Sequence, residues 1–128
     1  MTTCFVSGHL DCTQEEFEEH YAPRIHDAIA KGHNFVVGDA NGADTMAQEY
    51  LRDMVNAGHL DNRCVRVFHA YKQPRNNLGF NTLGNFPSQN AKDKAMTECS
   101  DYDILWIRQG RESSGTARNA ERRKKLSK

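Results

Sequence analysis

The chain has 128 residues with 17 Lys and Arg against 17 Asp and Glu, so its formal net charge is zero, and its length fits one domain, residues 1–128. No apolar run is long enough for a membrane span and no signal segment is visible, so we expect no membrane association. The four cysteines and six histidines are dispersed without the spacing of a disulfide framework or a metal site. We therefore expect a reduced, cytoplasmic protein with no metal and no cofactor.

A strand, a glycine-containing turn and a helix follow one another at the start of the chain. Residues 4–6 form an apolar strand that leads into a turn over residues 7–11. Thr13 and Glu16 have the spacing of a capping box, which predicts that a helix begins just after Thr13. Its apolar pattern contains Pro23, which predicts a kink or a restart with Pro23 in a first turn.

The same succession recurs in the central part of the chain. Residues 35–37 are apolar and mostly β-branched, as in a buried parallel strand, and residues 38–42 form a tight turn. A helix follows, because apolar residues recur at helical spacing until Gly58, where a helix stop is expected. Its predicted apolar face comprises Ala43, Met46, Ala47, Tyr50, Leu51, Met54 and Val55. The N-terminus of such a helix offers free N–H groups and is a ready anion site.

Asp39 and Asp44 lie at this predicted anion site, where a carboxylate has a task other than binding phosphate. Three roles fit: capping the helix, holding a ribose hydroxyl, or acting on a sugar. Spacing alone does not separate a cap at Asp44 from a catalytic carboxylate, because acidic caps are common.

Residues 64–70 predict a third strand, which a long polar segment follows. Residues 71–89 contain two Pro, two Gly and several Asn, a composition that predicts an irregular loop. Long loops in compact domains are commonly functional, so Arg75 and Asn76 are candidate ligand contacts. A polar loop without a ligand fits the same composition. A short helix over residues 91–99 is predicted after it.

The last part of the chain repeats the strand–turn–helix pattern. A buried strand over residues 103–107 leads into a turn rich in Gly and Ser that opens a final helix. Ser113, Ser114 and Thr116 supply hydroxyls there, and the N–H groups around Gly115 supply donors, as a phosphate cradle requires. Ser and Thr are also ordinary helix caps, so this turn alone is a weak signal.

Three strand–turn–helix corners in one small chain indicate a Rossmann-like α/β fold. We expect a three-layer sandwich with a mainly parallel sheet of about four strands. Parallel strands point their carboxyl ends the same way, so the corners meet at one edge, where ligands bind in open α/β sheets. The pattern therefore predicts a domain that binds a phosphorylated small molecule.

The charge is unevenly distributed along the chain. Residues 1–61 carry 3 Lys and Arg against 11 Asp and Glu, whereas residues 62–128 carry 14 against 6. The cations concentrate in the final helix, which fits a solvated helix whose cations complement its own dipole. Pairing of acidic and basic halves between subunits is a second interpretation. Nucleic-acid binding is a third, disfavoured because no aromatic residues alternate with the cations.

The three corners together resemble the SLOG superfamily, a Rossmann-like group that includes the lysine-decarboxylase-like phosphoribohydrolases and the DNA-processing protein A family, and in particular its small YspA-like branch. The most specific block is Gly-Asp-Ala-Asn-Gly-Ala-Asp at residues 38–44. Residues 7–11, the pair Arg75 and Asn76, and residues 114–116 complete the resemblance, which covers nearly the whole chain.

The resemblance implies binding of a nucleotide or a nucleotide derivative, including NAD-related molecules, at the carboxyl edge of the sheet. Some members hydrolyse the N-glycosidic bond of nucleoside monophosphates, and others only sense a ligand. In a hydrolase, Asp44 or Asp39 would be the catalytic carboxylate facing the ribose. His9 would anchor phosphate or protonate the leaving base, or would be a turn histidine without a catalytic task. The predicted ligand-binding residues are Ser7, Gly8, His9, Gly38, Gly42, Arg75, Asn76, Ser113, Ser114, Gly115, Thr116 and Asn119.

The chain departs from the phosphoribohydrolase motif Pro-Gly-Gly-x-Gly-Thr-x-x-Glu. Ser113 and Ser114 replace its glycines, and Asn119 replaces its glutamate. An amide forms hydrogen bonds but takes no proton, which favours a non-catalytic sensor or sequestering module, whereas the two carboxylates of the central corner favour an N-glycosidase. Single-stranded DNA binding through the basic half is a third, more distant alternative. We also expect a homo-oligomer, because relatives commonly pair.

Overall fold

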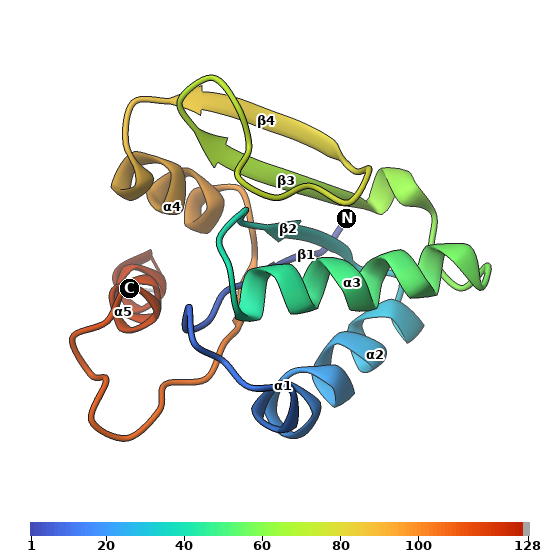
Figure 1. The fold of residues 1–128 in the computed structure, drawn as a ribbon, viewed down its shortest axis with the longest axis horizontal. Helices are drawn as coiled ribbons and strands as arrows, with labels where there is room; N and C mark the ends of the chain where they lie inside the picture. Colours follow the sequence, from blue (N-terminus) through green and yellow to red (C-terminus); the bar gives the residue numbers. More distant parts are fainter. Residues whose placement is uncertain (127–128) are drawn as a thin grey trace.

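The structure, a computed structural model that describes residues 1–126, is an α/β fold built on one five-stranded sheet (Figure 1). The order across the sheet is β4-β3-β2-β1-β5, and every neighbouring pair is parallel. The strands are β1 (Thr3–Val6), β2 (Asn34–Val37), β3 (Val65–Ala70), β4 (Asn81–Phe86) and β5 (Tyr102–Ile104). The predicted Rossmann-like class with a parallel sheet is confirmed.

Helices cover both faces of this sheet, so the molecule has three layers (Figure 1). One face carries α1 (Gln14–His20), α2 (Ala22–Ala30) and α3 (Ala43–Asn56). The other carries α4 (Gln89–Glu98) and α5 (Gly115–Leu126), and a short 3-10 helix (Asn62–Cys64) precedes β3. No helix in the described part of the chain is long and apolar enough to cross a membrane.

The sheet divides the core into two unequal parts, because consecutive strand side chains point to opposite faces. Val6 and Val37 pack in the larger cluster, with α1, α2 and α3. Phe5 and Val36 pack in the smaller one, against Met96 of α4. Burial on both faces explains why these strands are continuous apolar runs in the sequence.

The first helical segment restarts at the point that Pro23 predicted. Thr13 and Glu16 form both hydrogen bonds of the capping box at the start of α1. Tyr21 separates α1 from α2, and Pro23 lies in the first turn of α2, where its missing N–H costs no helical hydrogen bond.

The predicted strand over residues 103–107 is wrong at its C-terminal end, because β5 stops at Ile104. The N–H of Trp106 donates to the Tyr21 hydroxyl instead of to a strand, at 3.1 Å. The Trp106 ring stacks on His20, with 4.1 Å between the ring centroids. The chain therefore leaves the sheet early and turns toward α1.

β4 is the element that the sequence did not predict. The composition of residues 71–89 predicts an irregular loop, but Asn81–Phe86 form a strand and make the sheet five-stranded rather than four-stranded. β4 lies at the edge and is mostly exposed, so it carries polar residues and lacks an apolar pattern. Packing requires Gly84 in it, because a Cβ there would overlap the ring of His69.

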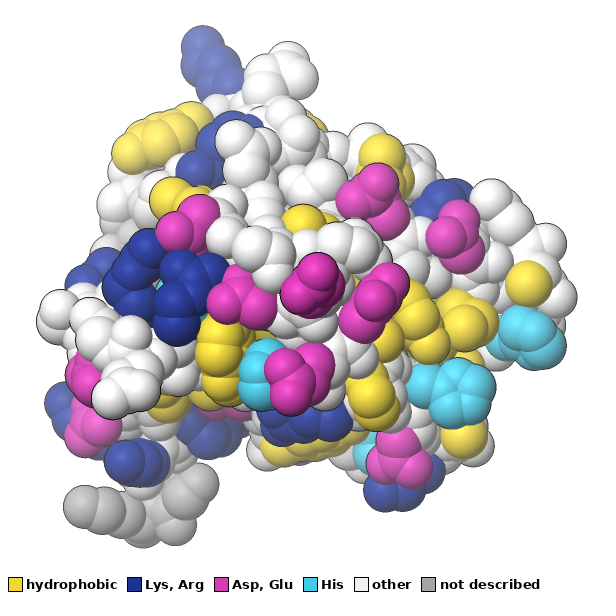
Figure 2. Space-filling view, turned by 60° about the horizontal axis from the view of Figure 1, so that its bottom comes forward, with side chains coloured by type: hydrophobic (Ala, Val, Ile, Leu, Met, Phe, Trp, Pro, Cys, Tyr) yellow, Lys and Arg dark blue, Asp and Glu magenta, His cyan; other side chains and the backbone are white. Residues whose placement is uncertain are grey.

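Ion pairs join the acidic start of the chain to its basic second half. Arg108 contacts Asp11 at 3.0 Å and Glu16 at 2.6 Å, and Arg111 contacts Asp11 at 2.7 Å. Figure 2 shows acidic side chains beside Lys and Arg side chains on one face of the molecule. These pairs fix the segment that follows β5 against the start of α1.

Substitution of Gly42 tests how closely the central corner packs against the first corner. Its φ is +77°, and a Cβ there would overlap the carbonyl oxygens of His9 and Leu10. Gly58, after α3, has φ +84° but open space around it. We expect Gly42→Ala to lower the free energy of unfolding by about 3 kcal/mol, and Gly58→Ala by about 1 kcal/mol, in urea denaturation. Equal losses would mean that the backbone conformation alone sets the cost.

Candidate functional site

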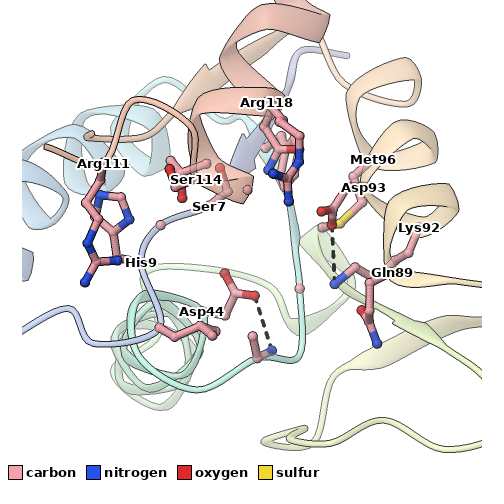
Figure 3. Close-up of a pocket in the computed structure, with 18 of the residues that line it drawn as sticks. Ser7, His9, Asp44, Gln89, Lys92, Asp93, Met96, Arg111, Ser114 and Arg118 are labelled. Carbon is pink, nitrogen blue, oxygen red and sulfur yellow. Dashed lines mark hydrogen bonds and ion pairs between the residues drawn. The ribbon is translucent and has the colours of Figure 1, made fainter. Parts of the chain in front are cut away.

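A cavity of about 550 Å³ opens at the carboxyl edge of the sheet (Figure 3). It lies beyond the ends of β1 and β2, between the N-terminal ends of α3 and α5 and the side of α4. Its position is the one expected for ligands in open parallel sheets, and its size is that of small-molecule sites.

The structure brings most of the predicted site residues together around this cavity. They come from the first corner, the central corner, the segment after β3 and the start of α5. The lining includes Ser7, Gly8, His9, Gly38, Asp44, Arg75, Ser114, Gly115, Thr116 and Asn119. Asp39, Gly42, Asn76 and Ser113 do not line it.

These remaining residues support the lining from behind. Asn76 donates to the carbonyl of Asp39 at 2.8 Å and to the side-chain oxygen of Asn41 at 3.1 Å. The carbonyl of Ser113 accepts a hydrogen bond from Arg118 at 3.1 Å. Their contacts hold the corners in place.

Asp39 is 1% exposed and is held by a network of cations. Arg75 donates its backbone N–H to Oδ2 at 2.8 Å, and its Nε and Nη2 to Oδ1 at 3.2 and 2.8 Å. The ammonium of Lys92 lies 3.7 Å from Oδ1. Burial by itself raises the pKa of Asp39, but the hydrogen bonds from Arg75 and the charge of Lys92 outweigh it, and the pKa is lowered. Asp39 is therefore a carboxylate that fastens α4 and the segment after β3 to the central corner.

Asp44, in the first turn of α3, faces the cavity and is 8% exposed. Its Oδ2 accepts a hydrogen bond from the N–H of Ala40 at 3.2 Å, and no other residue among 1–126 donates to it. Burial raises the pKa of Asp44 to about 7, although the charge of Lys92 acts in the opposite direction. A carboxyl group that titrates near neutral pH is suited to proton transfer.

His9 is a buried, neutral ring on the cavity wall. The N–H of Arg108 donates to His9 Nε2 at 2.9 Å, which requires this nitrogen to be unprotonated. Burial lowers the pKa of His9, and the charges of Arg108 and Arg111 lower it further. His9 therefore holds the segment after β5 at the cavity, and its ring proton is on Nδ1.

The hydroxyl of Ser7 is a buried polar group on the cavity wall. Ser7 is 6% exposed, and its Oγ has no hydrogen-bond partner within the described residues. Buried hydroxyls are nearly always hydrogen-bonded, so the Ser7 hydroxyl is available for a hydrogen bond with a water molecule or a ligand. Figure 3 shows Ser7 on the same side as Ser114, which caps α5 by accepting from the N–H of Ala117 at 3.2 Å. The first N–H groups of a helix have no partner inside it.

Sequence reasoning missed three of the cations around the cavity. Lys92, Arg111 and Arg118 line it together with the predicted Arg75. A signal for Lys92 was present, because it lies four residues before the buried Met96 on the inner face of α4, where an apolar residue is expected. Arg118 lies one turn into α5, and nothing in the sequence singles out Arg111.

Comparison with protein-family models, with curated proteins and with solved structures found no match to this chain. The family resemblance therefore rests on the motif residues and is consistent with the parallel α/β fold. Within residues 1–126, no group of three or more His, Cys, Asp or Glu side chains is placed to hold a metal ion.

Asp39→Asn tests the network behind the cavity. The change leaves the buried ammonium of Lys92 and the guanidinium of Arg75 without their shared carboxylate, so we expect the free energy of unfolding to fall by about 3 kcal/mol in urea denaturation. The control is Asp27→Asn, which removes an exposed ion pair with Lys31 at 2.8 Å and is expected to cost less than about 1 kcal/mol. A similar loss in both variants would contradict the role given to Asp39.

Asp44→Asn tests the buried acid through the pH dependence of stability. The folded-state pKa, about 7, is raised above the ordinary value of 3.8, so stability falls as pH rises between these values and is lowest above pH 7. An amide has no such dependence. We expect the free energy of unfolding of the variant, relative to the wild type, to rise by about 3 kcal/mol from pH 5 to pH 8. The exposed Asp53→Asn on the same helix is the control, and parallel curves for Asp44→Asn would contradict this assignment.

Proposed function

We propose that this chain is a small SLOG-type domain that binds a nucleotide or a nucleotide derivative in the cavity. The observation that carries the proposal is the unpaired, buried hydroxyl of Ser7 beside the start of α5. A phosphate group there would accept hydrogen bonds from Ser7 and from the first N–H groups of α5. Arg111 and Arg118, which also line the cavity, would balance its charge.

The far side of the cavity suits the remainder of a nucleotide. Phe5 and Met96 belong to the buried core beneath the cavity, and Gln89 and Asp93 of α4 contribute groups that hydrogen-bond a base or a sugar. Figure 3 shows Gln89, Asp93 and Met96 on the side opposite Ser7 and Ser114. Most of the cavity lining is polar or charged, which suits a polar ligand such as a nucleotide.

Asp44 favours hydrolysis of the N-glycosidic bond of the bound nucleotide. A departing base needs a proton, and a carboxyl group that is protonated near neutral pH supplies one. Asp44 is the carboxyl group of the central corner that faces the cavity, whereas Asp39 is engaged with Arg75 behind it.

Asn119 favours the second candidate, a non-catalytic sensor or sequestering module. It is buried, lines the cavity and accepts a hydrogen bond from Arg122 at 2.7 Å. Its amide would contact a ligand without exchanging a proton with it, in the place where the resembling hydrolases have a glutamate.

The test is to incubate the protein with nucleoside monophosphates, NAD and ADP-ribose, and to record the melting temperature and the released base together. We expect at least one of these compounds to raise the melting temperature, with a stabilisation of about 2.7 kcal/mol at one hundred times its Kd. Release of base would identify an N-glycosidase, whereas stabilisation by a ligand that stays intact would identify a sensor.

The matched variants are Arg118→Gln, at the cavity, and Lys124→Gln, exposed on the same helix. Loss of a charge-assisted bond at Arg118 is expected to weaken binding about tenfold, and the change at Lys124 to leave it unaltered. No stabilisation by any compound would contradict the proposal. Binding of an oligothymidylate with a steep salt dependence would instead support the single-stranded DNA alternative.

A further inference from the structure

Besides Asp44, two carboxylates line the cavity: Asp11, which is paired with Arg108 and Arg111, and Asp93 of α4. Asp93 lines the cavity together with Asp44, although the two residues belong to different helices. Figure 3 shows the Asp93 carboxylate across the cavity from that of Asp44. The negative charge of Asp93 also contributes, after burial, to the raised pKa of Asp44, so the two groups interact electrostatically.

The environments of these two carboxyl groups are opposite. Asp93 forms an ion pair with the buried ammonium of Lys92, with 3.4 Å between Nζ and Oδ1. Its side chain is partly exposed toward the cavity, so a water molecule has access to it. Asp44 is buried and accepts one hydrogen bond, from Ala40. A pair of carboxyl groups that differ in this way is the arrangement by which enzymes assign an acid and a base.

We propose that Asp93 is a catalytic residue, the base that takes the proton from the attacking water while Asp44 protonates the departing base of the nucleotide. This inference rests on the proposed function, because it needs a nucleotide in the cavity. Glycoside hydrolysis commonly uses two carboxyl groups. Because position 119 of α5 carries an amide, this inference assigns the second of them to α4.

The step is balanced with water as the only co-reactant. The bond between the sugar C1′ and the base nitrogen breaks, and its electron pair goes to the base, which takes the proton of Asp44. The water oxygen bonds to C1′ and its proton goes to Asp93. The products are the free base and the sugar 5-phosphate. Proton exchange with solvent then returns Asp93 to the carboxylate and Asp44 to the acid.

The experiment compares two substrates that differ in the leaving group. A nucleoside monophosphate needs an acid, whereas 4-nitrophenyl riboside 5-phosphate does not, because nitrophenolate leaves without a proton. We expect Asp93→Asn to lose on the order of 10²-fold or more in kcat on both substrates. Asp44→Asn is expected to lose a similar factor on the nucleotide and to stay within about tenfold of wild type on the nitrophenyl substrate. Glu98→Gln, exposed on the same helix as Asp93, is the control with unchanged activity.

A second measurement separates catalysis from a structural effect of the Asp93–Lys92 ion pair. Asp93→Ala leaves space for a small carboxylate, so sodium formate is expected to restore part of its activity. Formate has no such effect on a variant that is merely distorted. The increase in melting temperature with the nucleotide should be retained in Asp93→Asn, because asparagine keeps a hydrogen-bonding side chain at this position and loses only the ability to accept the proton of water.

The other outcomes overturn either the role of Asp93 or the proposed function. Asp93→Asn activity within a few-fold of wild type, or no rescue by formate, contradicts the role of Asp93 and leaves the nucleotide site standing. A wild-type protein that binds a nucleotide and releases no base also contradicts the role of Asp93, while nucleotide binding holds. If no nucleotide raises the melting temperature, the proposed function itself is wrong.

Discussion

The buried carboxylate of Asp39 holds together the segments that form the cavity. A charge with 1% exposure is tolerated only where cations and hydrogen-bond donors surround it. Arg75 supplies these donors from the segment after β3, and Lys92 supplies an ammonium from α4. Because both partners come from elements distant in the sequence, satisfying one carboxylate fixes the end of β2, a polar segment and a helix relative to one another.

The same constraint produces the contrast between Asp39 and Asp44, which lie five residues apart at the same corner. Asp39 takes the guanidinium of Arg75, so that its charge is compensated where it is buried. Asp44 receives a single hydrogen bond, from Ala40, and burial raises its pKa to about 7, so that its neutral form is favoured below that pH. One corner thus contains a carboxylate that stabilises the fold and a carboxyl group that is free to exchange a proton with the cavity.

The parts of the fold that the sequence predicted are those set by neighbouring residues. The capping box at Thr13, the restart at Pro23 and the corner at residues 38–44 depend on local turn and helix chemistry, and parallel topology then brings the corners to one edge. β4 was not predicted because an edge strand needs no apolar pattern. Spacing also gave no means of separating Asp39 from Asp44, since the partner that distinguishes them, Arg75, is thirty-six positions away.

The residues of α4 that line the cavity could not be predicted from the sequence for a related reason. Lys92 and Asp93 belong to no recognisable motif. They become candidate site residues only because α4 lies across the cavity from the central corner. The amide at Asn119 argues against catalysis only when α5 is considered alone. In an open parallel sheet, several helices present side chains to the same edge, so a carboxylate missing from one helix is chemically replaceable by a carboxylate from another. For the proposed activity the relevant question is therefore which carboxylates line the cavity together, and the two that do so from different helices are Asp44 and Asp93.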